Sequence, residues 1–248
     1  GSGALINNTS LDRTPYVITA DHCGKNASEE DMLLWLFYFH YQFYSCWNPG
    51  EEPTKRSLRG CEQIAASSNA GIQGSDFFLV KLSREIPEDY NPYFLGWSRE
   101  TDGLQQGYSI HHPWGDVKKI STYTEPLADG TINGGTQNGY WEVFWSETES
   151  GHGVTEPGSS GSPIFNVDGN LVGTLTGGQA SCSESGLFAP DYYGKFSYHW
   201  DQNGNQENQI LEPWLDPGAT GVLYLDGIYM GDEELQKENG YLISIQPN

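Results

Sequence analysis

Residues 157–163 read PGSSGSP and place Ser160 on a tight turn flanked by glycines. A serine hydroxyl acts as a nucleophile when an imidazole takes its proton and backbone N–H groups face the developing oxyanion. A glycine-flanked turn can present such groups, and we expect the N–H groups of Gly158 and Ser160 to form an oxyanion hole. Because Gly, Ser and Pro also build ordinary exposed turns, this segment alone fits a surface loop better.

A histidine and an acid precede this serine along the chain. His22 lies in TADHC at residues 19–23, and Asp76 begins the apolar run DFFLV at residues 76–80. A catalytic serine works with a histidine that shuttles its proton and a carboxylate that orients the imidazole, and the order His, Asp, Ser is that of chymotrypsin. We therefore predict that His22, Asp76 and Ser160 are the catalytic residues. The alternative is a core histidine, a turn aspartate and a capping serine.

Further segments, in one order along the chain, resemble the trypsin-like serine peptidases and, within them, the bacterial lysyl endopeptidases. They are residues 3–9, 16–24, 75–82, 110–113, 153–163, 177–178 with 181–182, 191–194 and 214–217. The resemblance stops at about residue 226. It implies an all-β fold of the chymotrypsin type, with two six-stranded-type antiparallel β-barrels and a short C-terminal helix, and with its first strand missing from this chain.

The resemblance also implies a role for each catalytic residue. Asp76 orients His22 and stabilises its imidazolium form, His22 serves as general base and then as general acid, and Ser160 forms and releases an acyl-enzyme. We therefore expect a serine endopeptidase, a hydrolase of protein or peptide substrates, that acts as a monomer without a cofactor or metal. Two alternatives remain, namely an endopeptidase of this fold with another P1 preference and a catalytically silent peptidase-like binding module.

Asp191, in DYYGK at residues 191–195, occupies the position where lysyl endopeptidases carry the carboxylate of the P1 pocket. A buried carboxylate pairs with an ammonium or guanidinium group, so the resemblance implies cleavage after Lys, or after Lys and Arg. The alternative is that Asp191 caps the turn before a strand. An edge strand at residues 176–178 would pair with an extended peptide. The other expected substrate-binding residues are Trp145, Thr176, Gly177 and Gly178.

Two positions depart from the family pattern. Thr176 stands where lysyl endopeptidases carry a histidine, so the aromatic–imidazole stack that Trp145 would complete is not expected. Ser159 stands where trypsin carries the acid that meets the freed N-terminus on activation, so we do not expect activation by that ion pair.

The composition agrees with this interpretation. Glycine occurs 31 times in 248 residues, which suits many strands joined by tight turns. The 33 acidic and 12 basic residues give a formal net charge of −21, which disfavours nucleic acid as a partner. We attribute this charge to solubility, with electrostatic steering of basic substrates as the alternative. No apolar run is long enough for a membrane span, and the densest, residues 32–44, is predicted to be a long buried strand.

The cysteines are Cys23, Cys46, Cys61 and Cys182, and three pairings are formally possible. We prefer a Cys46–Cys61 disulfide, whose loop of about 15 residues would add roughly 3 kcal/mol. In the family that the chain resembles, the counterparts of Cys23 and Cys182 pair with cysteines upstream of Gly1, which suggests a fragment of a longer precursor. Disulfides form in oxidising compartments, so we expect a secreted protein of bacterial type, extracellular or periplasmic.

The expected layout has an N-terminal barrel at residues 1–98, a C-terminal barrel at 99–225 and a C-terminal extension at 226–248. The first barrel would supply His22 and Asp76, and the second would supply Ser160, so the site forms at their junction. Alternation and turn signals predict strands at residues 3–9, 15–20, 33–44, 61–68, 76–82, 107–111, 117–124, 138–146, 163–176 (a hairpin) and 192–200, a surface loop at 46–57 and a helix at 208–215. The end of the extension, residues 242–248, weakly resembles the start of C-terminal sorting domains.

Metal sites are poorly supported by the sequence. The cysteines show no spacing typical of zinc. Residues 201–207 carry oxygen ligands at alternating positions, with Glu212 twelfth as in a calcium loop, but Gln206 replaces the glycine that the sixth position requires. We therefore expect turns and helix caps in this segment rather than calcium binding.

Overall fold

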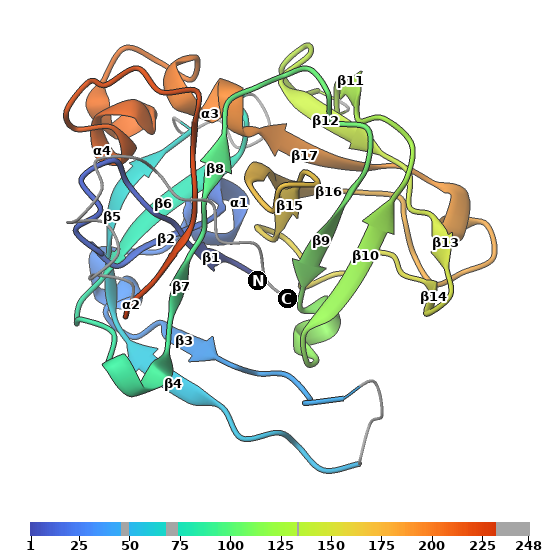
Figure 1. Ribbon diagram of the computed structural model, residues 1–248, viewed down its shortest axis with the longest axis horizontal. Coiled ribbons are helices and arrows are strands. Elements are labelled where there is room, and N and C mark those ends of the chain that lie inside the picture. The colour runs from blue at the N-terminus through green and yellow to red at the C-terminus, as the bar shows by residue number, and fades with distance from the viewer. Residues whose placement is uncertain (46–49, 68–73, 133, 232–248) are drawn as a thin grey trace.

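The computed structural model of this chain describes residues 1–45, 50–67, 74–132 and 134–231 (Figure 1). Most of its regular elements are strands. They form two main sheets, one from the N-terminal part of the chain and one mainly from the C-terminal part. The first sheet is antiparallel, with the order β1 (Ala4–Leu5), β2 (Tyr16–Ala20), β6 (Phe77–Leu82) and β5 (Cys61–Ala66). Five of the six residues of β6 are buried, as expected for a central strand that is covered on both faces.

The second sheet is larger, and Ser160 lies on the turn just before its strand β15 (Pro163–Phe165). Its path is β10 (Lys119–Tyr123), β9 (Gly107–His111), β15 (Pro163–Phe165), β16 (Leu171–Gly178), β17 (Asp191–Lys195), β12 (Tyr140–Val143) and β11 (Ala128–Gly130). All pairs along this path are antiparallel, while β8 (Trp97–Ser98) joins β16 in parallel and β18 (Tyr224–Leu225) pairs with β8. The predicted hairpin is formed by β15 and β16, and Gly169 takes the positive φ of +79° that its turn requires.

Three two-stranded ribbons and several short helices complete the fold. The ribbons pair β3 (Leu36–Phe39) with β4 (Arg56–Arg59), β7 (Tyr93–Phe94) with β19 (Ile228–Tyr229), and β13 (Glu147–Thr148) with β14 (Gly151–His152). The α-helices are α1 (Asp21–Gly24), α2 (Glu29–Met32), α3 (Phe196–Asp201) and α4 (Glu212–Leu215). The 3-10 helices are η2 (Glu88–Tyr90), η3 (Pro113–Gly115), η4 (Gly186–Phe188) and η5 (Glu207–Gln209). Within the described ranges, none of the helices is long and apolar enough to cross a membrane.

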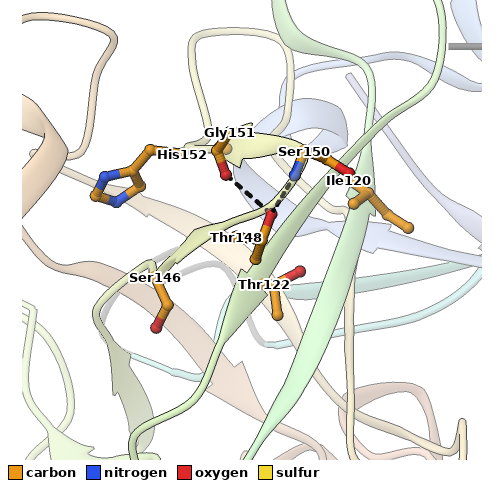
Figure 2. A pocket seen from close by; sticks show the side chains of 8 residues that line it. Ile120, Thr122, Ser146, Thr148, Ser150, Gly151 and His152 are labelled. Carbon is orange, nitrogen blue, oxygen red and sulfur yellow. Dashed lines mark hydrogen bonds between the residues drawn. The ribbon is translucent and has the colours of Figure 1, made fainter.

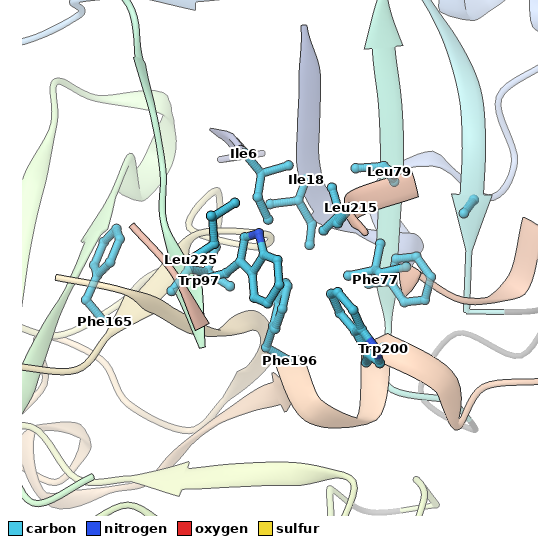
Figure 3. Packing of buried hydrophobic residues seen from close by; sticks show 13 residues of the cluster. Ile6, Ile18, Phe77, Leu79, Trp97, Phe165, Phe196, Trp200, Leu215 and Leu225 are labelled. Carbon is cyan, nitrogen blue, oxygen red and sulfur yellow. The ribbon is translucent and has the colours of Figure 1, made fainter. Parts of the chain in front are cut away.

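One hydrophobic cluster joins the two sheets. It includes Ile18 and Phe77 from the first sheet, Trp97 from β8, and Phe196 and Trp200 from α3. The indole of Trp97 is fully buried, with ring centroids 4.8 Å from Trp200 and 5.5 Å from Phe196, and Figure 3 shows these side chains facing one another. Because this core is shared, burial of apolar area holds the two sheets in a fixed relation.

The predicted all-β class is confirmed, but the predicted closed barrels are wrong. The first sheet has four hydrogen-bonded strands in an open order, and the second is also open. The strand expected at residues 33–44 does not join the first sheet, because β3 pairs with β4. The division at residues 98 and 225 remains a prediction. Two strands lie across it, since β8 belongs to the second sheet and β19, in the extension, pairs with β7. Residues 242–248 lie outside the described residues.

The long buried strand predicted at residues 32–44 is wrong. The strand spans only Leu36–Phe39, and the side chains of Leu36 and Tyr38 are half exposed. A capping box of Ser28 and Asp31 starts α2 just before it, and the β3–β4 ribbon extends away from the body of the molecule (Figure 1). Apolar density alone overestimated the burial here because only one neighbouring strand pairs with β3.

Two predictions near the C-terminus are also wrong. The strand expected at residues 192–200 ends at Lys195 and continues as helix α3. The single helix expected at residues 208–215 is two short helices, η5 and α4, with Ile210 extended between them at φ −138° and ψ 160°. A continuous helix would need an N–H from Pro213 to the carbonyl of Gln209, and proline has no N–H to donate.

The predicted disulfide is not confirmed. Cys23, Cys61 and Cys182 are free thiols, and Cys46 lies outside the described residues. Cys61 is buried on β5, with its Sγ atom 3.7 Å from the carbonyl oxygen of Met32. Burial raises the pKa of the Cys61 thiol to about 11, so this side chain packs as a neutral group.

Candidate active site

The first sheet brings His22 and Asp76 together. Strand β2 runs into α1, which carries His22, and Asp76 directly precedes the neighbouring strand β6. One carboxylate oxygen of Asp76 lies 2.7 Å from His22 Nδ1, and the other accepts a 2.9 Å hydrogen bond from the His22 backbone N–H. With Nδ1 donating to the carboxylate, Nε2 carries the lone pair of the neutral ring and is available as a base.

The environment of this pair favours a charged histidine. Asp76 is fully buried, whereas about a third of the His22 side chain is exposed. The hydrogen bond to Asp76 is the main cause that raises the pKa of His22 above its ordinary value. The Asp76 backbone has a φ of +60°, a left-handed conformation that is costly for a residue other than glycine. Strain of this kind persists where the surrounding structure holds it.

Residues from the C-terminal part of the chain fix Ser75, which directly precedes Asp76, by hydrogen bonds. The Ser75 hydroxyl lies 2.6 Å from His199 Nδ1, and the other ring nitrogen, Nε2, lies 3.0 Å from the Thr174 hydroxyl on β16. The Ser75 N–H donates to the side chain of Asn203 at 2.9 Å. Burial lowers the pKa of His199 to about 3, so the ring is neutral at neutral pH and uses one nitrogen as donor and the other as acceptor.

The turn that carries Ser160 has an unusual backbone. Gly158 and Gly161 have φ values of +99° and +83°, which other residues rarely adopt. Within the turn, the Ser162 N–H donates to the Ser159 carbonyl at 2.9 Å, and the Gly161 N–H donates to Leu175 on β16 at 2.8 Å. In the described part of the chain, neither the Gly158 nor the Ser160 amide donates a hydrogen bond, which leaves both predicted oxyanion donors available.

This turn packs against the end of β2, next to the histidine. A Cβ atom added to Gly161 would lie 2.1 Å from Thr19 Oγ1 and 2.7 Å from the backbone nitrogen of Ala20. Ser2 also fastens the turn, since its N–H donates to the Ser160 carbonyl at 2.8 Å and its hydroxyl to the Gly158 carbonyl at 3.1 Å. The structure thus brings Ser160 to the end of the strand that leads into α1.

No hydrogen bond joins the Ser160 hydroxyl to the His22 imidazole within the described residues. The structure therefore forms the His–Asp half of the predicted triad and places the serine turn beside it, without the proton-transfer contact. Such contacts are often long in a free enzyme and tighten when substrate binds.

Asp191 lies at the start of β17 and is almost fully buried. One carboxylate oxygen, Oδ2, accepts hydrogen bonds from Trp145 Nε1 at 2.7 Å and from the Thr155 hydroxyl at 2.6 Å. Desolvation by burial is the main cause that raises the pKa of Asp191. Trp145 thus contacts the Asp191 carboxylate through its indole nitrogen. Thr155 was not predicted, because a threonine five residues before a serine carries no recognisable signal.

The predicted substrate-binding strand borders this carboxylate. Thr176, Gly177 and Gly178 end β16, and Gly178 pairs with Asp191 across the sheet. A Cβ atom added to Gly178 would lie 2.2 Å from Asp191 Oδ1, so only glycine leaves that oxygen accessible from this side. The buried hydroxyl of Thr176 has no hydrogen-bond partner in the described part of the chain.

Two cavities lie elsewhere. One, of about 180 Å³, borders the β13–β14 ribbon, and Figure 2 shows Thr148 at its centre, hydrogen-bonded to Gly151. Its one titratable side chain, His152, contacts the Trp145 carbonyl oxygen at 2.9 Å. The other, of about 580 Å³, lies between residues 12–15 and 81–88. Neither contains a predicted site residue.

Metal binding gains no support among the described residues. No group of three or more His, Cys, Asp or Glu side chains converges there. In the segment weighed as a calcium loop, the Asn203 side chain holds Ser75, and Gln206 and Gln209 form a capping box. These side chains therefore serve as turn and cap residues, as the sequence interpretation had it.

Comparison with known proteins supplies the family. The chain is 28% identical over 206 residues to a protein named lysyl endopeptidase from Pseudomonas aeruginosa, a match that covers 81% of this chain and 42% of that protein. The chain thus spans less than half the length of this relative.

Solved structures show weaker likenesses. The MamO protease domain from Magnetospirillum magneticum has a TM-score of 0.47 and 15% identity, covering 79% of this chain and 83% of that one. Rv3671c from M. tuberculosis, in an inactive form, has a TM-score of 0.44 and 12% identity, covering 80% and 77%. Family membership rests instead on the family model described as lysyl endopeptidase, C-terminal domain, which matches residues 1–194. The chain belongs to this family.

Proposed function

We propose that this protein is a serine endopeptidase that cleaves peptide bonds through an acyl-enzyme. The observation that carries the proposal is the double contact of one buried carboxylate, that of Asp76, with the ring and the backbone of His22. In the neutral ring, this contact would leave Nε2 as the free base. The glycine turn that packs against β2 would then present Ser160 as the hydroxyl to be deprotonated.

The reaction would follow from this geometry. As the Ser160 oxygen attacks the scissile carbonyl, its proton moves to His22 Nε2, and Asp76 stabilises the imidazolium that forms. The free N–H groups of Gly158 and Ser160 would donate to the carbonyl oxygen as it gains negative charge. The imidazolium then gives its proton to the leaving amine. Water, deprotonated by the same imidazole, releases the acyl group from Ser160.

We propose that the preferred residue on the acyl side of the cleaved bond is Lys, with Arg as the alternative. Asp191 is a buried carboxylate whose charge nothing in its hydrogen-bond set neutralises, since Trp145 and Thr155 are neutral donors. A cationic side chain would supply the missing counter-charge. The name of the P. aeruginosa relative supports Lys.

Labelling of the serine tests the proposal directly. A biotinylated fluorophosphonate should modify Ser160 in the wild type, with the site assigned by peptide mass spectrometry. Ser160→Ala should abolish labelling and peptide hydrolysis. Ser162→Ala is the matched control, because it removes another buried hydroxyl from the same turn. A wild type that is folded yet unlabelled would instead support a catalytically silent binding module.

We also propose that the protein is secreted. The support is its strongly acidic composition, which suits a soluble protein, and its similarity to a bacterial lysyl endopeptidase. Expression of the full-length gene product in its own cells, followed by immunoblotting of medium, periplasmic and cytoplasmic fractions, tests this. Recovery in the cytoplasm alone would contradict the proposal.

A further inference from the structure

We propose that His111, buried behind the nucleophile turn, is a positioning residue that holds Ser159 and thereby keeps Ser160 in its reactive orientation. The inference rests on the proposed peptidase function and concerns a residue that takes no part in the chemistry itself. It arises from a hydrogen-bonded chain of three buried side chains that the proposed reaction does not use.

The chain of contacts runs from β10 through β9 to the turn. His111, the last residue of β9, is 1% exposed, and its Nδ1 lies 2.9 Å from the Ser159 hydroxyl. Its Nε2 lies 2.9 Å from the hydroxyl of Ser121 on β10, which is also 1% exposed. A neutral imidazole has one donor and one acceptor, so both of its nitrogens are satisfied. Burial lowers the pKa of His111 to about 4, which keeps the ring neutral at neutral pH.

Ser159 is fixed at every polar atom. Its hydroxyl contacts His111 and accepts a 3.3 Å hydrogen bond from the Glu156 N–H. Its own N–H donates to the Glu156 carbonyl at 3.0 Å, and its carbonyl accepts from the Ser162 N–H at 2.9 Å. The side chain is fully buried, so water cannot replace these partners.

The position of Ser159 explains why this matters for catalysis. It lies between Gly158 and Ser160, and its carbonyl group belongs to the peptide bond that carries the Ser160 N–H, one of the two predicted oxyanion donors. Gly158 and Gly161, on either side of the Ser159–Ser160 pair, both have a positive φ and leave the backbone of the turn more freedom than other residues would. Contacts from outside the turn must select one orientation, and His111 is a rigid ring anchored on a sheet strand. A displacement of about 1 Å in such a site can cost about 10²-fold in rate.

The chain offers a matched pair of variants. Ser159→Ala and Ser121→Ala each remove one buried hydroxyl from the same imidazole and leave one ring nitrogen without its partner. Ser159→Ala also leaves the Glu156 N–H without its 3.3 Å acceptor, so we expect it to be the less stable of the two. Only Ser159→Ala breaks the connection between His111 and the turn.

The assay combines steady-state kinetics on a P1-Lys ester, the rate of fluorophosphonate labelling and the thermal midpoint of each variant. Ser159→Ala should lower kcat and the labelling rate by about 10²-fold with little change in KM, because the P1 pocket is intact. Ser121→Ala should lower the thermal midpoint, by no more than Ser159→Ala does, and change kcat little.

A second pair keeps the test independent of folding defects in either serine variant. His111→Leu should lose kcat as Ser159→Ala does, and His111→Gln should restore part of it, because the amide can donate and accept at a similar reach.

Equal kcat losses in Ser159→Ala and Ser121→Ala would overturn the inference, as would a Ser159→Ala variant that is labelled as fast as the wild type. An unlabelled wild type would overturn the proposed function, and this inference with it.

Discussion

Replacing Asp191 with Asn separates the charge of the predicted P1 pocket from its shape. The Asn amide has the size of the carboxylate, and its oxygen can still accept from Trp145 Nε1 and the Thr155 hydroxyl, which both contact Oδ2 in the wild type. The variant therefore removes the negative charge, together with one of the two oxygens that accept from Trp145, Thr155 and the Ala180 backbone. We expect cleavage after Lys to weaken and the folded state to tolerate the change.

The magnitude follows from the burial of the carboxylate. Asp191 is 1% exposed, so a cationic P1 side chain that reaches it would form a desolvated charge pair. Removing one member of such a pair costs about 2–5 kcal/mol, or roughly 30- to 5,000-fold in kcat/KM. Because Asn keeps the two neutral donors satisfied, we expect a loss near the lower part of that range, about 10²-fold.

Two peptide substrates that differ only at P1, with Lys in one and norleucine in the other, provide the assay. Norleucine matches the methylene chain of Lys without the ammonium group. In Asp191→Asn the kcat/KM for Lys should fall by about 10²-fold while that for norleucine stays the same or rises. An unchanged ratio of Lys to norleucine would refute the assignment of Asp191 to the pocket.

Asp191→Asn should lower the activity on Lys substrates, but we do not expect it to lower the free energy of unfolding at pH 7. Desolvation raises the pKa of folded Asp191 above its ordinary 3.8. A carboxyl whose pKa is higher in the folded state loses stability as pH rises through that pKa, so the ionised group lowers the free energy of unfolding at pH 7. Asp191→Asn should therefore be at least as stable as the wild type at pH 7, with the difference shrinking at acidic pH. Urea denaturation that shows a destabilised variant at pH 7 would contradict this reasoning.

Other residues give further tests. The Asp76 hydrogen bond raises the pKa of His22 above its ordinary 6.5, so wild-type kcat/KM should rise with pH through a midpoint above 6.5. In a pH–rate profile, Asp76→Asn should lower that midpoint and should also lower kcat by about 10⁴-fold. Trp97→Ala should lower the free energy of unfolding by about 3–5 kcal/mol in urea titrations. Gly161→Ala should abolish hydrolysis, because its Cβ would lie 2.1 Å from a hydroxyl of β2, whereas Gly151→Ala, also at positive φ but with nothing within 4 Å, should retain it. Equal activities in these two glycine variants would contradict the packing of the turn.

The parts of this fold that local patterns specify could be predicted from the sequence. The apolar runs of β2 and β6, and the turn at Asp168 and Gly169 between β15 and β16, depend on neighbours in the chain, and these elements form within a few residues of their predicted ranges. The contact of His22 with Asp76 is long-range. It was nevertheless foreseen, because the chemistry of a proton shuttle demands a carboxylate partner.

The parts that depend on tertiary contacts could not be predicted. The segment FSYHWD has the aromatic content of a strand, yet it forms α3 because Phe196 and Trp200, four residues apart, both reach the shared core from one helical face. Closure of the sheets could not be predicted for a similar reason. An alternating pattern identifies a strand but does not say which other strand it pairs with. The partners of Asp191 lie 36 and 46 residues away and carry no local signal.

The proposed catalytic geometry depends more on the packing between the two sheets, where Trp97 lies, than on either sheet alone. Trp97 donates from its indole N–H to the Asn7 carbonyl at 2.9 Å, while its strand β8 pairs with β16, whose end borders Asp191. Trp97 thus holds the N-terminal segment next to β2 through its indole and pairs through its backbone with the strand that leads to the predicted substrate edge. A cavity at Trp97 should change kcat and stability together. A cavity in the cluster that contains Val80 and Leu82, which alternate along β6 with Phe77 and Leu79 of the shared core, should lower stability with little change in kcat.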